Sequence, residues 1–99
     1  MFKKLICLTL MLFSGVTFAN VIIPEVLEGH LDVKKNFSSK YVENRFLNIW
    51  LPPGYSNTRK YDVLYMHDGR MLFDAKTTWN KQEWQVDEVA AKLIQSGQF

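Results

Sequence analysis

Hydrophobic and polar residues alternate along the first half of the chain, and a period of two predicts β-strands. The stretch from Val21 to Lys35 alternates partially around Gly29, so we expect one strand with a bulge or two short strands. The stretch from Tyr41 to Leu51 alternates more regularly and is followed by two prolines, which end a strand because proline lacks a backbone donor. A short polar turn separates the two stretches. The pattern therefore predicts an antiparallel pair.

A continuous apolar run replaces the alternation further along the chain. Tyr61 to His67, with Val63 to Met66 at its centre, is typical of a strand that is covered on both faces, as in a sheet flanked by helices. Asp68 and Gly69 end this run after too few residues for a helix. We expect a third strand here and a loop from Asp68 to Trp79.

Helical spacing returns near the end of the chain. Asn80 and Glu83 stand three residues apart, as in a capping box at a helix start, and Gly97 is placed as a C-terminal cap. The apolar residues between them recur at helical intervals: Val86, Val89, Ala90, Leu93 and Ile94. Three strands followed by one helix predict an α/β fold with an incomplete sheet, since the second parallel strand of a crossover unit is not in this sequence.

The first 19 residues have the three-part layout of a secretory signal peptide. Two lysines precede an apolar run from Leu5 to Phe13, and small residues follow up to Ala19. We expect cleavage after Ala19, export to the periplasm or the medium, and a domain of residues 20–99. The alternative is an uncleaved membrane anchor, although the run is short for a hydrocarbon core of about 30 Å.

Charge and cysteine content exclude several classes of partner. The chain has 12 Lys and Arg against 10 Asp and Glu, and Lys3 and Lys4 are the only charges in the leader, so residues 20–99 are neutral overall. Without a basic excess we expect no nucleic-acid binding and, once the leader is removed, no stable membrane insertion. Cys7 is the only cysteine and also lies in the leader, so no disulfide is expected. The oligomeric state stays open.

Few residues could carry chemistry of a common kind. Without a cysteine in the mature chain a Cys/His metal site is excluded, and a histidine site would need both His30 and His67, so we expect no metal. Gly-rich phosphate loops are missing, and no cofactor is expected. Gly-x-Ser-x-Gly is also missing, and the remaining serines are expected in turns or at a helix end: Ser38, Ser39, Ser56 and Ser96.

The segment from His67 to Asp74 follows the predicted buried strand, at the sheet edge where α/β proteins bind ligands. Gly69 lets the backbone approach a substrate closely, and the amides after it can point at a developing oxyanion. The alternative is a plain loop in which Asp68 caps its own turn and Phe73 packs in the core.

Four sequence words in this order and spacing carry a resemblance. They are Ile49-Trp50-Leu51-Pro52-Pro53-Gly54-Tyr55, Tyr61-Asp62-Val63-Leu64-Tyr65-Met66-His67-Asp68-Gly69, Leu72-Phe73-Asp74 and Glu83-Trp84-Gln85-Val86-Asp87-Glu88. Together they resemble the N-terminal part of the Putative esterase family within the α/β-hydrolase fold, which includes the esterase D, enterochelin esterase and feruloyl esterase types. The resemblance covers Gly29 to Phe99.

The resemblance implies a serine carboxylic-ester hydrolase with a Ser-Asp/Glu-His triad. In that pattern the first three strands and first helix precede the nucleophile, so the chain is expected to be an N-terminal fragment without nucleophile, acid or base, and inactive alone. The loop after the third strand would supply oxyanion-hole amides at Gly69 or Arg70, with Met71 as the outside candidate. The substrate of the full-length parent would be a small ester. The third strand would normally pair with a fourth that these residues do not include.

Two other functions remain open. A small secreted strand-rich module could bind carbohydrate or a protein partner through Trp50, Trp79, Trp84 and the tyrosines, but we expect these aromatics to pack in the core instead. The second open function is that of an accessory chain that completes a separately encoded hydrolase.

Overall fold

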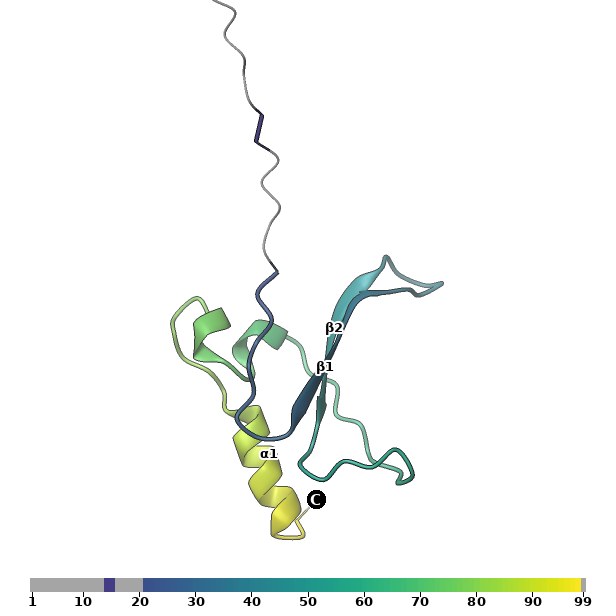
Figure 1. Ribbon diagram of the computed structural model, residues 1–99, viewed down its shortest axis with the longest axis vertical. Helices are drawn as coiled ribbons and strands as arrows, with labels where there is room; N and C mark the ends of the chain where they lie inside the picture. Colours follow the sequence, from purple (N-terminus) through teal and green to yellow (C-terminus); the bar gives the residue numbers. More distant parts are fainter. Residues whose placement is uncertain (1–13, 16–20, 99) are drawn as a thin grey trace, which may run out of the picture.

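The computed structural model describes residues 14–15 and 21–98 and contains five short elements (Figure 1). In chain order they are β1 (His30–Phe37), β2 (Arg45–Leu51), the 3-10 helices η1 (Gly69–Met71) and η2 (Ala75–Thr77), and α1 (Val86–Gln95). The predicted signal peptide, apart from Ser14 and Gly15, lies outside the described residues. No helix in the described part of the chain has the length and apolar character needed to cross a membrane.

The predicted antiparallel pair is confirmed. β1 and β2 form a two-stranded sheet in which His30 faces Leu51 and Lys34 faces Leu47. The bounds differ from those expected, because Val21 to Val26 form no strand and the register irregularity lies between Lys34 and Phe37 rather than at Gly29. β2 ends before the two prolines, as predicted, but begins later than Tyr41.

Gly29 forms a bend immediately before β1. Its φ is +77°, and a Cβ there would collide with the backbone oxygen of Leu51 and lie 2.8 Å from Trp50 Nε1. Trp50 Nε1 donates to the carbonyl oxygen of Glu28 at 2.8 Å, which holds the bend against β2. Glycine is required here by both its backbone angle and the close contact.

The third predicted strand is absent from the described residues, which corrects that prediction. Residues 61–66 pair with no strand, and their apolar side chains are exposed, Tyr65 to 90%. An apolar run becomes a strand only when another strand accepts its backbone bonds, and the described sheet has two strands. The fold is therefore a partial α/β arrangement with an unpaired extended segment.

The turn before that segment is ordered by its tyrosines. The Tyr55 amide donates to the Pro52 carbonyl at 3.0 Å. The rings of Tyr55 and Tyr61 stack with their centroids 5.1 Å apart, and the Tyr61 hydroxyl accepts from the Ser56 amide. The Pro-Pro-Gly-Tyr sequence thus forms a closed turn.

The helix is confirmed, but it begins five residues later than the capping box predicted, because its N-cap is Gln85 rather than Asn80. Gln85 precedes it in the left-handed region with φ 55°, and Asn80 instead accepts from the Gln82 amide in a local turn at 3.1 Å. The predicted C-terminal cap is confirmed: Gly97 has φ +75°, its amide donates to Ile94, and the Gln98 amide donates to Leu93.

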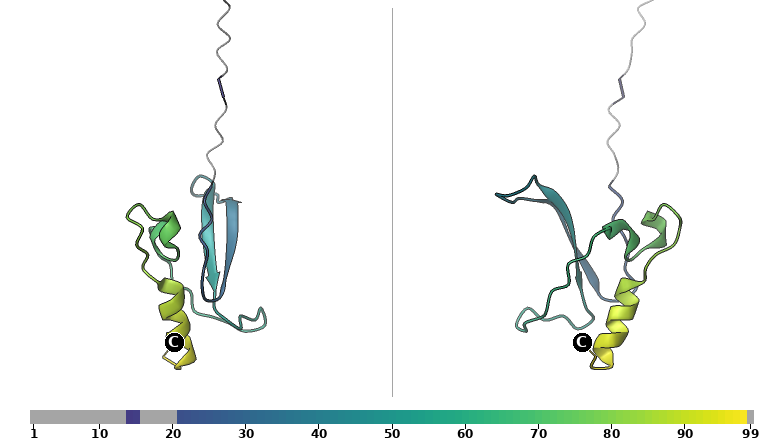
Figure 2. Two further views of the ribbon diagram at one scale, coloured as in Figure 1. Left: turned by 60° about the vertical axis from the view of Figure 1, so that its left-hand side comes forward. Right: turned by 180° about the vertical axis from the view of Figure 1, so that it is seen from behind.

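The core is small and lies where the loop after η1 meets α1. Among the described residues the buried hydrophobic side chains are Leu72, Phe73 and Ala91. Figures 1 and 2 show α1, η1 and η2 on one side and the hairpin on the other. Residues 24–29 run between the two sides and are bonded to both. We call residues 24–29 the strap.

Candidate functional site

The segment from His67 to Asp74 contains the predicted site residues. Asp68 adopts the left-handed region, with φ 58° and ψ 47°, and η1 begins immediately after it. The Met71 amide donates to the Asp68 carbonyl at 2.8 Å. In the described part of the chain no acceptor is found for the amides of Gly69 or Arg70, as expected for the first residues of a helical turn. Two adjacent donors are therefore available, and the third candidate, Met71, is occupied.

The alternative interpretation of this segment, a plain loop in which Asp68 caps its turn and Phe73 packs in the core, is confirmed for Phe73 and wrong for Asp68. Phe73 packs in the core with 5% of its surface exposed, whereas the Asp68 side chain makes no capping bond. The loop is thus anchored by its apolar end, while Asp68 and Arg70 at its other end are exposed and Gly69 between them is half-buried. Asp and Asn tolerate the left-handed region better than other side chains, which explains the residue at position 68.

An open hollow of about 600 Å³ adjoins these amides. It is lined by Asp68, Gly69, Arg70, Met71, Trp79, Asn80 and Trp84. Trp79 is 85% exposed and Trp84 is about half exposed, so the expectation that these tryptophans pack in the core is wrong. Two indole side chains and one guanidinium, beside two amides that have no acceptor among the described residues, suit a ligand with an aromatic or sugar ring and a polar group.

Asn48 lies beside the site on β2, and sequence reasoning missed it. Its Nδ2 lies 3.8 Å from where a Cβ on Gly69 would stand, so the residue at position 69 faces this amide. Its Oδ1 is buried without a partner among the described residues. A signal was available, because Asn48 is a polar residue between Phe46 and Trp50 on one face of an alternating strand.

The backbone holds the loop firmly in place. The Trp84 amide donates to the Met71 carbonyl at 2.8 Å, and the Val86 amide donates to Leu72 at 3.0 Å. The Thr77 hydroxyl bonds to the Arg70 carbonyl at 2.7 Å. These bonds position the amides at 69 and 70 and the tryptophan at 84 relative to one another.

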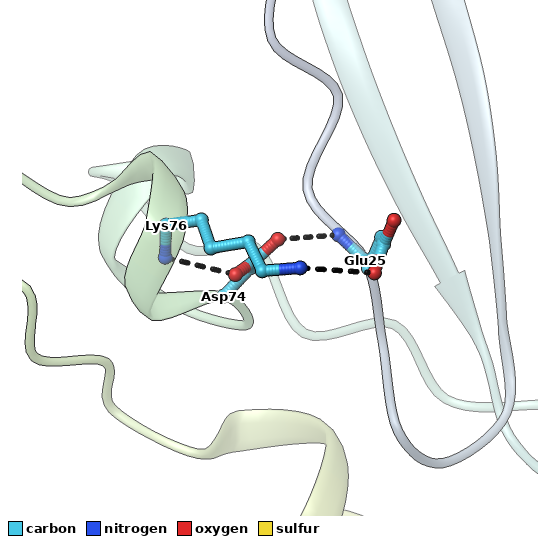
Figure 3. Close-up of polar contacts among 3 residues, drawn as sticks. All are labelled: Glu25, Asp74 and Lys76. Atoms are coloured by element: carbon cyan, nitrogen blue, oxygen red, sulfur yellow. Dashed lines mark hydrogen bonds and ion pairs between the residues drawn. The ribbon is translucent and has the colours of Figure 1, made fainter.

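Asp74 joins the loop to the strap (Figure 3). One carboxylate oxygen accepts from the Glu25 amide and the other from the Lys76 amide, both at 2.9 Å, while Lys76 Nζ lies 3.6 Å from Glu25 Oε2. The Glu25 hydrogen bond is the main reason why the pKa of Asp74 is lowered; partial burial opposes it, and the Lys76 amide and charge add to it. The carboxylate in the third sequence word is a structural anchor.

Asp87 makes a second anchor from the first turn of α1. Its side chain is fully buried, and its Oδ2 accepts from the amides of Leu27 at 2.8 Å and Glu28 at 3.2 Å. An acid in the first helical turn is favoured by the helix dipole, but burial of this one depends on the strap. Only the three-dimensional contact reveals that role.

Glu83, Asp87 and Glu88 bring three carboxylates together at the start of α1. One oxygen from each lies within 4.8 Å of the others, and the group is the one set of possible metal ligands found among the described residues. Burial raises the pKa of Glu83, and the charges of Asp87, Glu88 and Asp74 raise it further. Glu83 does not serve as the capping residue that its spacing predicted. His30 and His67 are exposed and belong to no such group.

Three of the four serines make the local bonds expected of turn and cap residues. Ser39 accepts from the Tyr41 amide, Ser56 bonds to the Thr58 hydroxyl at 2.8 Å, and Ser96 donates to the Leu93 carbonyl. These bonds explain the serines by local structure.

Comparison with known proteins identifies one family. Residues 38–99 match the model of the family described as Putative esterase, which covers the second half of the hairpin, the loop, the hollow and α1. Comparisons with curated proteins and with solved structures gave no significant match.

Proposed function

Because the chain belongs to the Putative esterase family, we propose that it forms part of a serine carboxylic-ester hydrolase and supplies that enzyme's oxyanion-binding loop. The observation that carries the proposal is the pair of unpaired amides at Gly69 and Arg70, which border an open hollow. They are held by bonds to Thr77 and Trp84 that do not depend on a ligand.

The chemistry of these amides follows from the reaction. When a nucleophile attacks an ester carbonyl, the carbonyl oxygen gains negative charge, and preorganised backbone donors stabilise it most when the charge is greatest. The amides of Gly69 and Arg70 would donate to that oxygen. Met71 cannot share this role, because its amide already donates to Asp68.

The attacking serine would come from outside these 99 residues, since they contain no Gly-x-Ser-x-Gly. An oxyanion donor stabilises a charge that another group must generate, so this chain alone should not turn over esters. The substrate we propose is a small acyl or aryl ester. Trp79 and Trp84 would contact its apolar part from the side of the hollow.

Export is the second part of the proposal. Residues 1–19 would act as a signal peptide and be removed after Ala19, which would place the domain in the periplasm or outside the cell. N-terminal sequencing of the product from a fractionated culture tests this. A mature protein that begins at Asn20 supports export, and a cytosolic product that keeps Met1 refutes it.

An amide-resolved titration tests the oxyanion loop directly. Phenylphosphonate, a soluble anion with an aromatic ring, is added to the ¹⁵N-labelled chain while the amide resonances are followed. We expect saturable shifts at Gly69 and Arg70 and little change at Met71, whose amide is the internal control. Shifts scattered over the lysines, with none at these two amides, would refute the assignment. Hydrolysis of aryl esters by the same sample should stay at background.

A carbohydrate-binding module is the alternative, and the exposure of Trp79 and Trp84 on one hollow favours it. Tryptophan fluorescence distinguishes the two. Quenching by neutral oligosaccharides that is lost in Trp79→Ala supports sugar binding. A response limited to aromatic anions and esters supports the hydrolase loop.

A further inference from the structure

The carboxylates of Glu83, Asp87 and Glu88 form a cluster that the proposed ester chemistry does not use. Glu83 precedes α1, and the other two occupy its first turn. One oxygen from each residue lies within 4.8 Å of the other two. We call these three residues the acidic cluster.

Two oxygens of the acidic cluster are buried and have no hydrogen-bond partner among the described residues. Asp87 is fully buried, and its Oδ2 is already used by the Leu27 and Glu28 amides, yet its Oδ1 accepts no bond among the described residues. Glu83 Oε2 is likewise buried and accepts no hydrogen bond from the described residues. Buried carboxylate oxygens in proteins are normally hydrogen-bonded, paired with a cation or bound to a metal.

No basic side chain supplies the missing charge in the part of the chain that is described. The ion pairs found there are Lys34 with Asp32 and Lys76 with Glu25, and neither involves the acidic cluster. The helix dipole favours Asp87 and Glu88 in the first turn, but it gives no donor to the two buried oxygens. Among the described residues, therefore, no donor and no cation balances these two oxygens.

We propose that the acidic cluster binds a divalent cation of the calcium class. Calcium takes oxygen ligands at 2.3–2.6 Å, so two ligands of one ion stand up to about 5 Å apart, and the 4.8 Å limit of the cluster falls within that range. Magnesium, at 2.0–2.1 Å, needs ligands within about 4.2 Å and a stricter octahedron. Calcium also accepts water in its remaining positions.

A bound cation would connect three parts of the fold. Glu83 is followed by Trp84, which lines the hollow, and Asp87 accepts hydrogen bonds from the strap. The ion would therefore fix the start of α1 against both. This proposal stands independently of the oxyanion loop, because it uses none of the same atoms.

Terbium luminescence tests the site in the chain as it stands. Tb³⁺ replaces Ca²⁺ on oxygen ligands, and Trp84, adjacent to Glu83, can sensitise its emission. We expect saturable emission on excitation of tryptophan and its loss when excess Ca²⁺ is added. Glu88→Gln should weaken Tb³⁺ binding by about tenfold or more, because ligand charge sets affinity in such sites.

The matched control is Glu43→Gln, which removes one exposed carboxylate outside the acidic cluster and should leave binding unchanged. Circular dichroism of both variants checks that α1 is retained. Absence of saturable emission from the wild type overturns the proposal, and so does equal binding by the two variants.

A proton shared between Glu83 and Asp87 is the competing explanation, and Glu83→Gln separates it from a cation. The glutamine amide would replace such a proton as donor. Greater exchange protection of the α1 amides in Glu83→Gln, together with no response of the wild type to Ca²⁺, would overturn the cation site. Loss of the Ca²⁺ response in this variant supports the site.

Discussion

Single side chains connect the two sides of this small protein. On the side of the 3-10 helices and α1, Asp74 and Asp87 accept hydrogen bonds from amides of the strap. On the side of the hairpin, Trp50 donates a hydrogen bond to a carbonyl oxygen of the strap. Gly29 allows the strap to turn into β1. Each contact is polar and directional, so each should be sensitive to the loss of one group.

Gly29→Ala tests whether the close contact at the bend matters beyond its backbone angle. The new Cβ would collide with the Leu51 carbonyl, and we expect the hairpin to lose about 1–3 kcal/mol. Hydrogen exchange of the β1 and β2 amides should then be roughly 5- to 150-fold less protected. Gly54→Ala is the control, because Gly54 has a similar φ of +73° with open space around it. Equal losses in both variants would show that the contact is unimportant.

Asp74 predicts a pH dependence at its contact with the strap. Its pKa is lowered in the folded state, so the ionised carboxylate is the form that stabilises the fold. That contribution is complete above the ordinary value of 3.8 and disappears as the pH falls through the lower folded-state value. The Glu25 amide resonance should titrate with a pKa below 3.8 in the wild type and not in Asp74→Asn. A midpoint at or above 3.8 would contradict the anchor.

The elements differ in how far the sequence determines them. β2 forms as its alternation and the following prolines predict, because it finds a partner in β1 nearby in the chain. Residues 61–66 carry a stronger apolar signal but form no strand, since a strand depends on a neighbour that no local pattern can supply. The helix body is local, whereas its start is displaced to Val86 by the left-handed Gln85.

In the candidate site, too, some features follow from the local sequence and others depend on contacts between distant residues. The segment from His67 to Asp74 could be singled out because it follows an apolar run, whereas the choice of Gly69 and Arg70 within it came from the family resemblance. Asn48, which lies beside Gly69, and Asp87, which holds the strap, make their contacts across the fold, and their sequence signal is only a polar residue on an apolar face. The acidic cluster also depends on the displaced helix start, because the predicted capping box would have used Glu83 differently.

The unpaired segment from Val63 to Met66 should govern association of the chain. An extended segment with exposed apolar side chains and unpaired backbone groups can pair with the same segment of another copy. Leu64→Lys should reduce concentration-dependent light scattering severalfold without loss of the helical signal. Val42→Lys, at an exposed apolar position of the hairpin turn, should leave the scattering almost unchanged. Equal effects would indicate that charge, and not this segment, controls association.

At the scale of the molecule, the core is too small for a strongly cooperative fold. Leu72, Phe73 and Ala91 are the buried hydrophobic residues of the described chain, and no disulfide can replace a core in residues 20–99. We expect the circular dichroism signal of the isolated chain to change gradually on heating. A sharp, reversible transition at low concentration would contradict this expectation and indicate a self-sufficient domain.

The strap also constrains the order of events during biosynthesis. Its bonds to Asp74 and Asp87 span 49 and 60 residues, whereas the hairpin closes locally. A nascent chain therefore cannot complete the bonds of the strap until residue 87 has left the ribosome, although Trp50 and Asp74 become available earlier. If the chain is exported as proposed, a translocation machinery that accepts only unfolded polypeptides would meet the strap before its last bonds, those to Asp87, can form.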